Sequence, residues 1–198
     1  MIQRPGFPTK TTSVYTLDSK NRIVSVEQKY VITGSPDVIT KTSYKYDANG
    51  YISESTVESD KKLPVTKFTW EDGNLTKAVT TLTKPDAGEK STTTNVYEYD
   101  KTKTMGTWDP GTTASPGVTL APSYSGKPTK NIIIKTTTTS ESAFVSPFLS
   151  FDYKFIATTI TSYTFDAKGL PVTFKTNTTS TSSGNLPLGL VLPNVTAK

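Results

Sequence analysis

Cysteine and histidine are both absent from the 198 residues of this sequence. Their absence excludes disulfides, thiolate nucleophiles, imidazole bases and the usual zinc sites. Long apolar runs are also lacking, and none approaches the ~18 residues that a transmembrane helix needs. These absences remove the commonest catalytic and metal-binding groups. We therefore expect no enzymatic activity, no catalytic residues, no cofactor and no metal site.

Positive charge is in slight excess, but it is not concentrated in one place. The formal net charge is +5, and arginine, the residue best suited to bidentate contacts with phosphates and bases, occurs only as Arg4 and Arg22. Through position 109, fifteen basic residues stand against fourteen acidic ones, and lysines are mostly single. This distribution is typical of a solvated surface, so we expect no nucleic-acid partner.

Threonine and tyrosine dominate what is present. Thr accounts for 38 residues and Tyr for 10, whereas Met and Trp occur only twice each. β-Branched and aromatic side chains suit the pleated, half-buried surface of a β-sheet. The composition therefore predicts an all-β chain, and its length fits a single domain over residues 1–198.

One unit recurs along the chain. It consists of an aromatic residue, any residue, an aromatic residue or Leu, an acidic residue, a short turn, and then an aliphatic residue. Copies of the unit begin at Tyr15, Tyr44, Phe68, Tyr97 and Tyr163. Aromatic residues two apart share one face of a strand, Asp or Asn bonds its own backbone in a turn, and Gly supplies positive φ. Each copy therefore predicts a β-hairpin.

Successive hairpins with further turn signals between them predict an antiparallel up-and-down meander of about 10–12 long strands. Side chains alternate along the uninterrupted run from Phe151 to Phe165, with mostly aromatic residues on one face and mostly polar residues on the other. A sheet of this kind has to cover its aromatic face. We therefore expect it to be strongly curled or closed into a soluble, barrel-like domain with the aromatic face as its core.

The turn signals are weaker in two copies. The unit at Tyr97 has no Gly in the turn expected at Lys101 to Lys103, and the unit at Phe68 is one residue short. The strand register near Lys101 and Asp72 is left open by the sequence.

Two segments depart from the repeat. Residues 106–129 are rich in Gly, Pro, Ser and Thr and are expected to form a long loop, a type of segment that is usually functional or disordered. Its Trp108 and Tyr124 are the candidate ligand-binding residues, because exposed aromatic rings on a loop suit stacking on sugars or docking to a partner. The alternative is that both rings pack onto the sheet.

The apolar tail over residues 180–198 is expected to pack as an edge strand or a plug. Its four leucines are spaced two apart, which places them on one face of an extended chain, while the prolines among them restrict pairing to one side. The four are Leu186, Leu188, Leu190 and Leu192.

The aspartates of the repeat, Asp18, Asp47, Asp100 and Asp166, have two interpretations. Paired carboxylates are what glycoside hydrolysis requires. Recurrence at one position of a repeat instead indicates that each aspartate caps a turn, and this is the interpretation that we adopt. The run from Asp47 to Gly50 looks like a fragment of a calcium loop, but no Glu follows at the required distance.

The units Tyr44-x-Tyr46-Asp47-x-x-Gly50 and Tyr163-x-Phe165-Asp166-x-x-Gly169 resemble the YD repeats of RHS-type shells and cell-surface proteins. Over residues 10–178 the chain resembles a Bacteroidetes-type family of uncharacterised secreted lipoproteins whose domain is described as having a porin-like fold. The resemblance implies a barrel-like all-β domain, export, and lipid attachment near an N-terminal Cys that this chain lacks. It implies no activity and no functional residues.

From these observations we expect a non-enzymatic interaction module that is exported to the periplasm or to the cell surface at the outer membrane. The expected partner is a glycan or an envelope protein. The start from Met1 to Pro5 has no apolar signal segment, so an exported form would have lost its leader. Two alternatives stay open at this point: a carrier that holds an apolar small ligand inside a barrel, and a purely structural or spacer domain.

Overall fold

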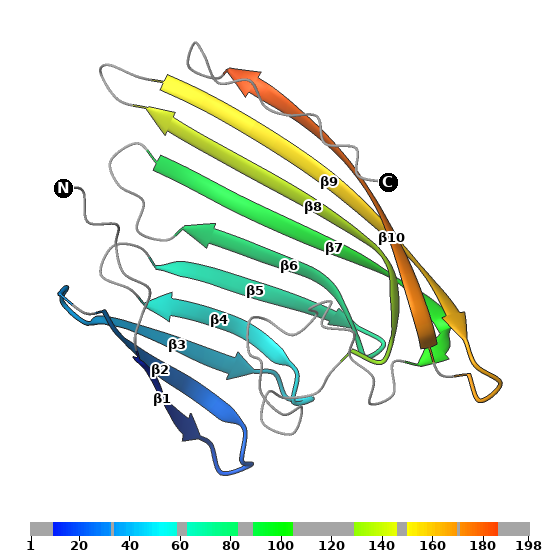
Figure 1. Cartoon of the computed structure of the whole chain (residues 1–198), viewed down its shortest axis with the longest axis horizontal. Coiled ribbons are helices and arrows are strands. Elements are labelled where there is room, and N and C mark those ends of the chain that lie inside the picture. The colour runs from blue at the N-terminus through cyan, green and yellow to red at the C-terminus, as the bar shows by residue number, and fades with distance from the viewer. Residues whose placement is uncertain are drawn as a thin grey trace.

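The structure is a computed structural model that describes residues 10–32, 34–58, 63–82, 89–104, 129–145, 150–169 and 171–185, and these residues form one antiparallel sheet of ten strands (Figure 1). The strands are β1 (Lys10–Leu17), β2 (Ile23–Val31), β3 (Val38–Tyr46), β4 (Ile52–Glu58), β5 (Pro64–Glu71), β6 (Asn74–Leu82), β7 (Glu89–Thr104), β8 (Asn131–Val145), β9 (Ser150–Phe165) and β10 (Pro171–Asn185). No helix occurs in the ranges just given. The predicted all-β meander is therefore confirmed.

The order of the strands in the sheet is their order in the sequence, β1 to β10. Every neighbouring pair is antiparallel, as expected for strands joined by short turns. In the described part of the chain β1 pairs with β2 and β10 pairs with β9, and the two end strands do not pair with each other. The predicted closure into a barrel is therefore not confirmed. The observed sheet is open.

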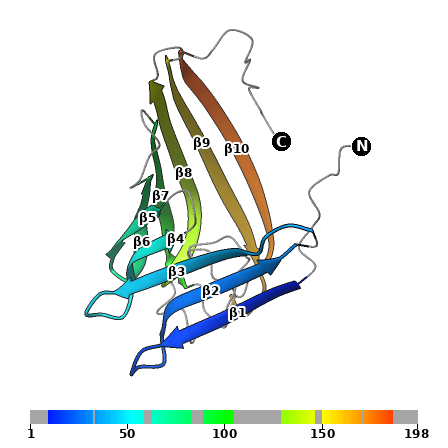
Figure 2. The ribbon, with the colours of Figure 1, turned by 90° about the vertical axis from the view of Figure 1, so that its left-hand side faces the viewer.

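The sheet is twisted along its width, as β-sheets normally are. Figure 2 shows β8, β9 and β10 standing upright while β1, β2 and β3 lie across their lower end. The strands also differ in length: β1 to β6 have seven to nine residues, and β7 to β10 have 15 or 16. The uninterrupted strand predicted from Phe151 to Phe165 is present as β9.

The turn expected at Lys101 to Lys103 does not end the strand. β7 continues to Thr104, which pairs with Asn131 at the start of β8, and residues 101–103 before it have no ladder partners. Of the tail expected over residues 180–198 as an edge strand or a plug, residues 180–185 are the end of the edge strand β10 and pair with β9. The leucines of the tail and most of the loop over 106–129 lie outside the described residues.

The turn between β5 and β6 settles the register that the sequence left open near Asp72. Glu71 pairs with Asn74, so the loop has two residues, Asp72 and Gly73. Both have positive φ, 52° and 81°. This is the conformation of a type I′ turn, in which Asp-Gly is a preferred sequence because its twist matches that of the flanking strands.

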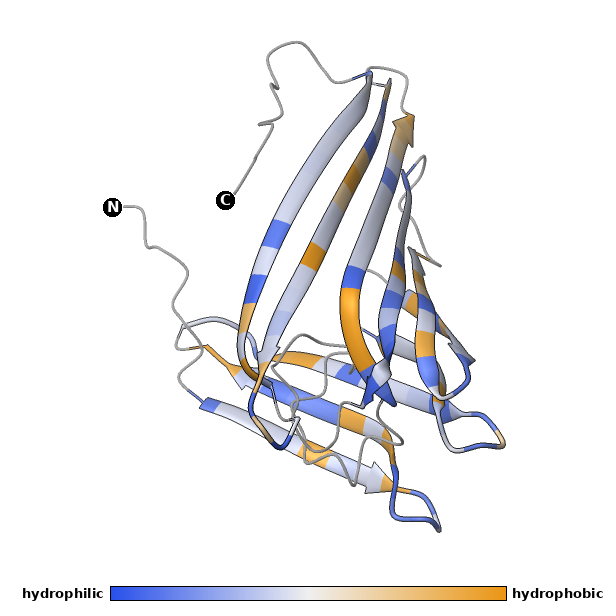
Figure 3. Cartoon of the chain, turned by 90° about the vertical axis from the view of Figure 1, so that its right-hand side faces the viewer, coloured by the Kyte–Doolittle hydropathy of each residue, from blue (hydrophilic) through white to orange (hydrophobic). Residues whose placement is uncertain are grey.

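The hydrophobic core of the described chain lies at one end of the sheet. This is the end at which the turns of the repeat join the two strands of each hairpin. The buried hydrophobic residues of the described chain are Ile23, Val26, Tyr44, Ile52, Leu75, Ala78, Ile132 and Ile133. Figure 3 shows scattered hydrophobic residues elsewhere, with a long hydrophobic stretch at the start of β8. The expectation that the whole aromatic face is core was therefore wrong: β9, which carries several aromatic residues, has no buried residue. Mid-strand positions hold Thr and Ser, which contribute little to a hydrophobic core.

Candidate functional site

The sequence placed ligand binding on Trp108 and Tyr124, and both lie outside the described residues. Their role stays a prediction. In the described ranges there is no group of three or more Asp or Glu side chains arranged to hold a metal ion. The same ranges contain no helix with the length and apolarity that a membrane-spanning helix needs.

Asp18, Asp47 and Asp166 cap turns, as predicted, and Asp100 makes the same kind of hydrogen bond within β7. A side-chain oxygen of each accepts a main-chain N–H two or four residues further along, at 2.8–2.9 Å. The donors are Lys20 and Arg22 for Asp18, Tyr51 for Asp47, Thr102 for Asp100, and Lys168 for Asp166. The hydrogen bonds from the Arg22 backbone and side chain lower the pKa of Asp18, and those from Thr102 lower the pKa of Asp100. All four side chains thus accept hydrogen bonds from the backbone of their own hairpin.

One aromatic residue of each copy after the first joins one hairpin to the next: the second aromatic residue in three copies, and the first, Tyr163, in the last copy. The side chain of this residue reaches the preceding hairpin. It donates a hydrogen bond to the main-chain oxygen of an aliphatic residue near the start of that hairpin's return strand. The bonds are Tyr46 Oη to Ile23 O (2.6 Å), Trp70 Nε1 to Ile52 O (2.7 Å), Tyr99 Oη to Leu75 O (2.6 Å) and Tyr163 Oη to Ile133 O (3.0 Å). We call each such contact between hairpins a junction.

All four junctions share one geometry. The ladder between two hairpins ends two residues after the acceptor and three residues before the donor; at the first junction the last pair is Ser25 with Ser43. The corresponding last pairs are Glu54 with Lys67, Lys77 with Val96, and Lys135 with Ile160. Beyond them the strands leave the ladder, and the aromatic donor supplies a hydrogen bond that the backbone does not make.

A β-bulge accompanies each acceptor. Within every hairpin the register shifts by one residue directly after the acceptor position, so that one residue of the return strand has no ladder partner. The five extra residues are Val24, Ser53, Thr76, Ile134 and Val172. A bulge bends the strand and increases its twist. The repeat thus encodes a bend at the same position of the return strand in every hairpin.

A buried polar cluster replaces a simple turn where β8 enters the sheet. Asn74, Thr129 and Asn131 are each at most 5% exposed. Asn74 Oδ1 accepts from the Asn131 main-chain N–H (2.8 Å), and Asn131 Nδ2 donates to Lys103 O (2.8 Å). No described buried side-chain polar atom lacks a partner. The cluster fixes the end of β7 and the start of β8 to β6, so its role is structural.

The end strands of the sheet are exposed and differ chemically. In β1, Leu17 occupies the position of the junction donor, and a leucine side chain cannot donate a hydrogen bond. In β10, Pro171 occupies the acceptor position, since it pairs with Phe165 as Ile52 pairs with Tyr46. Val172 and Phe174 beside it are 59% and 49% exposed. Leu17 therefore cannot act as a junction donor, whereas Tyr15 on the same strand holds the position of Tyr163, the donor of the last junction. Pro171, unlike Val172 and Phe174, is buried.

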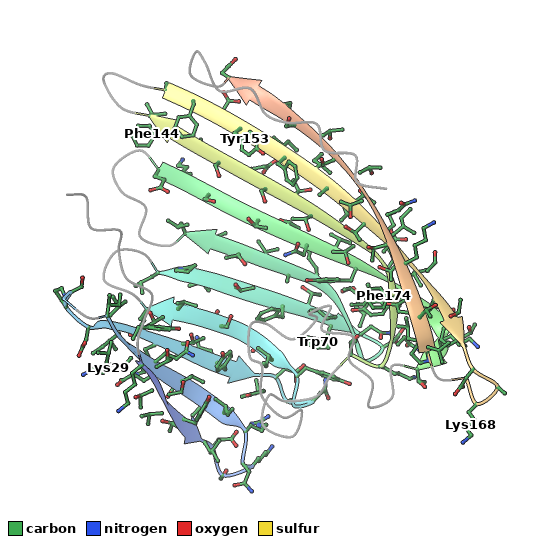
Figure 4. The ribbon with its side chains drawn as sticks, viewed as in Figure 1. Lys29, Trp70, Phe144, Tyr153, Lys168 and Phe174 are labelled. Carbon is green, nitrogen blue, oxygen red and sulfur yellow. The ribbon has the colours of Figure 1, made fainter. Side chains whose placement is uncertain are left out.

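A second surface combines aromatic rings and hydroxyls on β7, β8 and β9. Directly paired residues share a face, and so do residues two apart on one strand. Eight residues that meet these conditions form what we call the aromatic–hydroxyl patch: Phe144, Phe151, Tyr153, Phe155, Ser91, Thr93, Ser140 and Ser142. Glu89, which pairs with Phe144, lies on the same face. The rings of Phe144 and Phe151 stack with centroids 5.6 Å apart. Figure 4 shows Phe144 and Tyr153 at the end of the sheet away from Trp70.

The hydroxyls of the patch lie in two rows across the strands. Ser142 Oγ donates to Ser91 Oγ at 3.3 Å, and Thr93 and Ser140 share a hydrogen bond of the same length. All eight members are half-buried. The sequence had placed the aromatic members of β9 on one face correctly, but it had assigned them to the core. Their neighbours on β7 and β8 could not be identified without the register of the strands.

Comparison with protein-family models, with curated proteins and with solved structures found no match for this chain.

Proposed function

We propose that this protein is a non-enzymatic interaction module, exported to the periplasm or the outer-membrane surface, which binds a glycan on the aromatic–hydroxyl patch. The observation that carries the proposal is the close combination of aromatic rings with rows of hydroxyls on one face of β7, β8 and β9. Export, and attachment through a lipid, rest on the resemblance to secreted lipoproteins.

The chemistry of the patch matches that of a sugar ring. An aromatic ring offers an apolar face on which the C–H groups of a sugar can stack, and Tyr153 adds a polar tip to such a ring. Hydroxyls of Ser and Thr both donate and accept, so they can meet sugar hydroxyls in either role. The eight members are uncharged, and the carboxylate of Glu89 lies on the same face beside Phe144.

The two alternative functions fit the fold less well. A carrier needs an enclosed interior, and the described strands leave β1 and β10 unpaired with each other. A spacer needs no exposed pairing edge and no surface on which aromatic rings gather. A spacer role nevertheless becomes the better explanation if the module binds nothing.

A glycan array on the full-length protein tests the proposal, with two matched variants. Tyr153→Ala removes a ring of the patch, and we expect it to weaken glycan binding about tenfold, which corresponds to about 1.4 kcal/mol. Phe174→Ala removes an exposed ring on β10 outside the patch, and it should bind as the unchanged protein does. Silence on the array, or an equal loss for both variants, would contradict glycan binding at this surface.

A further inference from the structure

We propose that the edge strand β1 is a dimerisation surface, on which β1 of a second copy of this chain pairs antiparallel. The two copies are related by a two-fold axis that passes between the two Val14 residues, perpendicular to the sheet. The ten-stranded sheet of one copy then continues across the axis into that of the other.

β1 offers an edge that lacks the usual protection. In the described part of the chain it pairs with β2 alone, and Figure 2 shows it as the outermost strand at the lower end of the sheet. All of its residues except Ser13 are exposed. Natural edge strands are commonly short, bulged, or lined with charges and prolines. Here the ladder from Lys10 to Thr16 has no bulge, and Lys10 is the one charged residue of the strand.

The hydrophobic core of the first hairpins is open at β1. Tyr15 pairs with Val26 of the core, so the two lie on one face of the sheet, and Leu17 is two residues further along that face. Tyr15 and Leu17 are nevertheless exposed. A second copy of β1 covers their open side and adds its own Tyr15 and Leu17 next to them. The proposed interface therefore extends a core that already exists.

The sequence of β1 is its own complement when the axis lies at Val14. Ser13 of one copy is then directly opposite Tyr15 of the other, so that a small side chain leaves room for a large one. The two Tyr15 rings become diagonal neighbours, a distance that aromatic side chains can span. On the other face, Thr12 lies opposite Thr16.

Opposed threonines are already a feature of this sheet. Thr66 pairs with Thr80, and Thr159 pairs with Thr178, with the hydroxyl oxygens 2.8 and 2.9 Å apart. Cross-strand pairs of this kind stabilise a sheet. The dimer repeats the arrangement twice, once on each side of its axis.

Charge selects this register over its neighbours. A shift by one residue would place opposite faces of the two sheets side by side, so the second strand can move only in steps of two. In the proposed register Lys10 lies opposite Asp18, which Arg22 already contacts at 2.6 Å. A shift in one direction places Lys10 opposite Lys20, and opposed like charges are unfavourable in a sheet. A shift in the other direction replaces Asp18 with the uncharged Thr16.

A second copy suits this edge better than a different protein does. With Lys10 as its one charge, β1 has no pattern of charges that would select an unlike partner. Two-fold pairing also closes on itself, because each copy has one β1 and both are consumed. The expected assembly is therefore a dimer and not a filament.

The absence of cysteine allows the register to be tested by disulfide cross-linking of the full-length protein. Opposed residues of antiparallel strands have Cα atoms about 4.5–5.5 Å apart, within the range of a disulfide. Val14→Cys should therefore form a covalent dimer on mild oxidation. Ile39→Cys on β3 is the control, since Ile39 is 48% exposed and Val14 59%, and it should not cross-link. A mixture of Thr12→Cys and Thr16→Cys should cross-link more than either variant alone.

Sedimentation velocity tests the association without a cross-link. We expect the unchanged protein to dimerise, and Val14→Lys to weaken the dimer about tenfold or more, because two lysines then meet at the axis. Ile39→Lys should leave the dimer unchanged, and circular dichroism verifies that both variants are folded. A dimer that Val14→Lys leaves intact, or equal cross-linking of Val14→Cys and Ile39→Cys, would overturn the proposal. An unchanged protein that stays monomeric would overturn it as well, since β1 would then serve a different partner or none.

Discussion

The hydroxyl of Tyr46 lies 2.6 Å from the main-chain oxygen of Ile23, and this bond joins the second hairpin to the first. Burial raises the pKa of Tyr46, in keeping with its position beside the core formed by Ile23, Val26, Tyr44 and Ile52. Since Arg22 also lies over the Tyr46 ring, 4.2 Å from its centroid, the junction combines a hydrogen bond with a cation–π contact.

Tyr46→Phe should lower the free energy of unfolding by about 1 kcal/mol, because it keeps the ring and removes one partly buried hydrogen bond. Urea denaturation followed by circular dichroism measures the change. Tyr30→Phe is the control, since within the described ranges the Tyr30 hydroxyl bonds to the side chain of Gln28, two residues away on the same strand. Equal midpoints for Tyr46→Phe and the unchanged protein would show that the junction bond contributes nothing.

The buried amide pair of Asn74 and Asn131 predicts a larger effect. Asn74→Ala removes the acceptor of the Asn131 main-chain N–H and the donor to Asn131 Oδ1, leaving buried groups unpaired. We expect a loss of about 2–3 kcal/mol in the free energy of unfolding. Asn185→Ala, which breaks an exposed bond to Asp152, should cost less than about 0.5 kcal/mol. Similar losses for the two variants would contradict the role assigned to the cluster.

The hairpins could be predicted from the sequence because their signals are local. A turn aspartate, a Gly with positive φ and an aliphatic residue at the return are all within a few residues of each other, as in the turn from Asp47 to Ile52. The ten strands and their order follow from repeating that unit. The junctions are not local: Tyr46 and Ile23 are 23 residues apart, and only the register of β2 against β3 brings them together.

The last copy of the repeat shows why sequence alignment alone misassigns the donor. The motif aligns Tyr163 with Tyr44 and Phe165 with Tyr46, and Phe165 does pair with Pro171 as Tyr46 pairs with Ile52. At the junction, however, Tyr163 is the donor. The hairpin of β9 and β10 extends two residues further beyond the end of its ladder to β8 than the other hairpins extend beyond theirs. A phenylalanine at the second aromatic position also has no hydrogen to donate. The extra length depends on the register between β8 and β9, which the motif does not contain.

Tyrosine burial predicts a loss of stability at alkaline pH. Desolvation by burial raises the pKa of Tyr99 and of Tyr44 to about 12, from 10.0. Because the folded state holds these protons more tightly than the unfolded state, the stability that they contribute is fully present below pH 10 and is lost as the pH rises toward about 12. Unfolding midpoints in urea measured from pH 9 to about 11.5 should fall less steeply for Tyr99→Phe than for the unchanged protein.

Tyr15→Phe provides the comparison for this alkaline series, because Tyr15 is 45% exposed on the edge strand β1. Its slope should match that of the unchanged protein, and the ultraviolet absorbance of tyrosinate reports the ionisation directly. If Tyr99→Phe gave the same slope as Tyr15→Phe, ionisation of the buried phenol would not be the cause of alkaline unfolding.

The pairing of the last residues of β10 with β9 requires a glycine at position 184. Gly184 has φ of 129°, and a Cβ at this position would overlap the main-chain oxygen of Asp152 on β9. Gly169 also has positive φ, 78°, but a Cβ there meets no atom within 4 Å. Gly169→Ala therefore adds only backbone strain, about 1 kcal/mol, whereas Gly184→Ala adds strain and a backbone collision.

Because Gly184 lies one residue from the end of β10, the collision should be relieved by separation of the strand end rather than by unfolding of the sheet. We expect Gly184→Ala to accelerate amide hydrogen exchange in residues 182–185 and in residues 152–154 opposite them. The pairs from Thr173 to Asn177 on β10 should keep their protection, since they are far along the ladder from the collision. Unchanged exchange at residues 182–185 in Gly184→Ala would mean that β9 and β10 are not held at the distance that the pairing of Gly184 with Tyr153 requires.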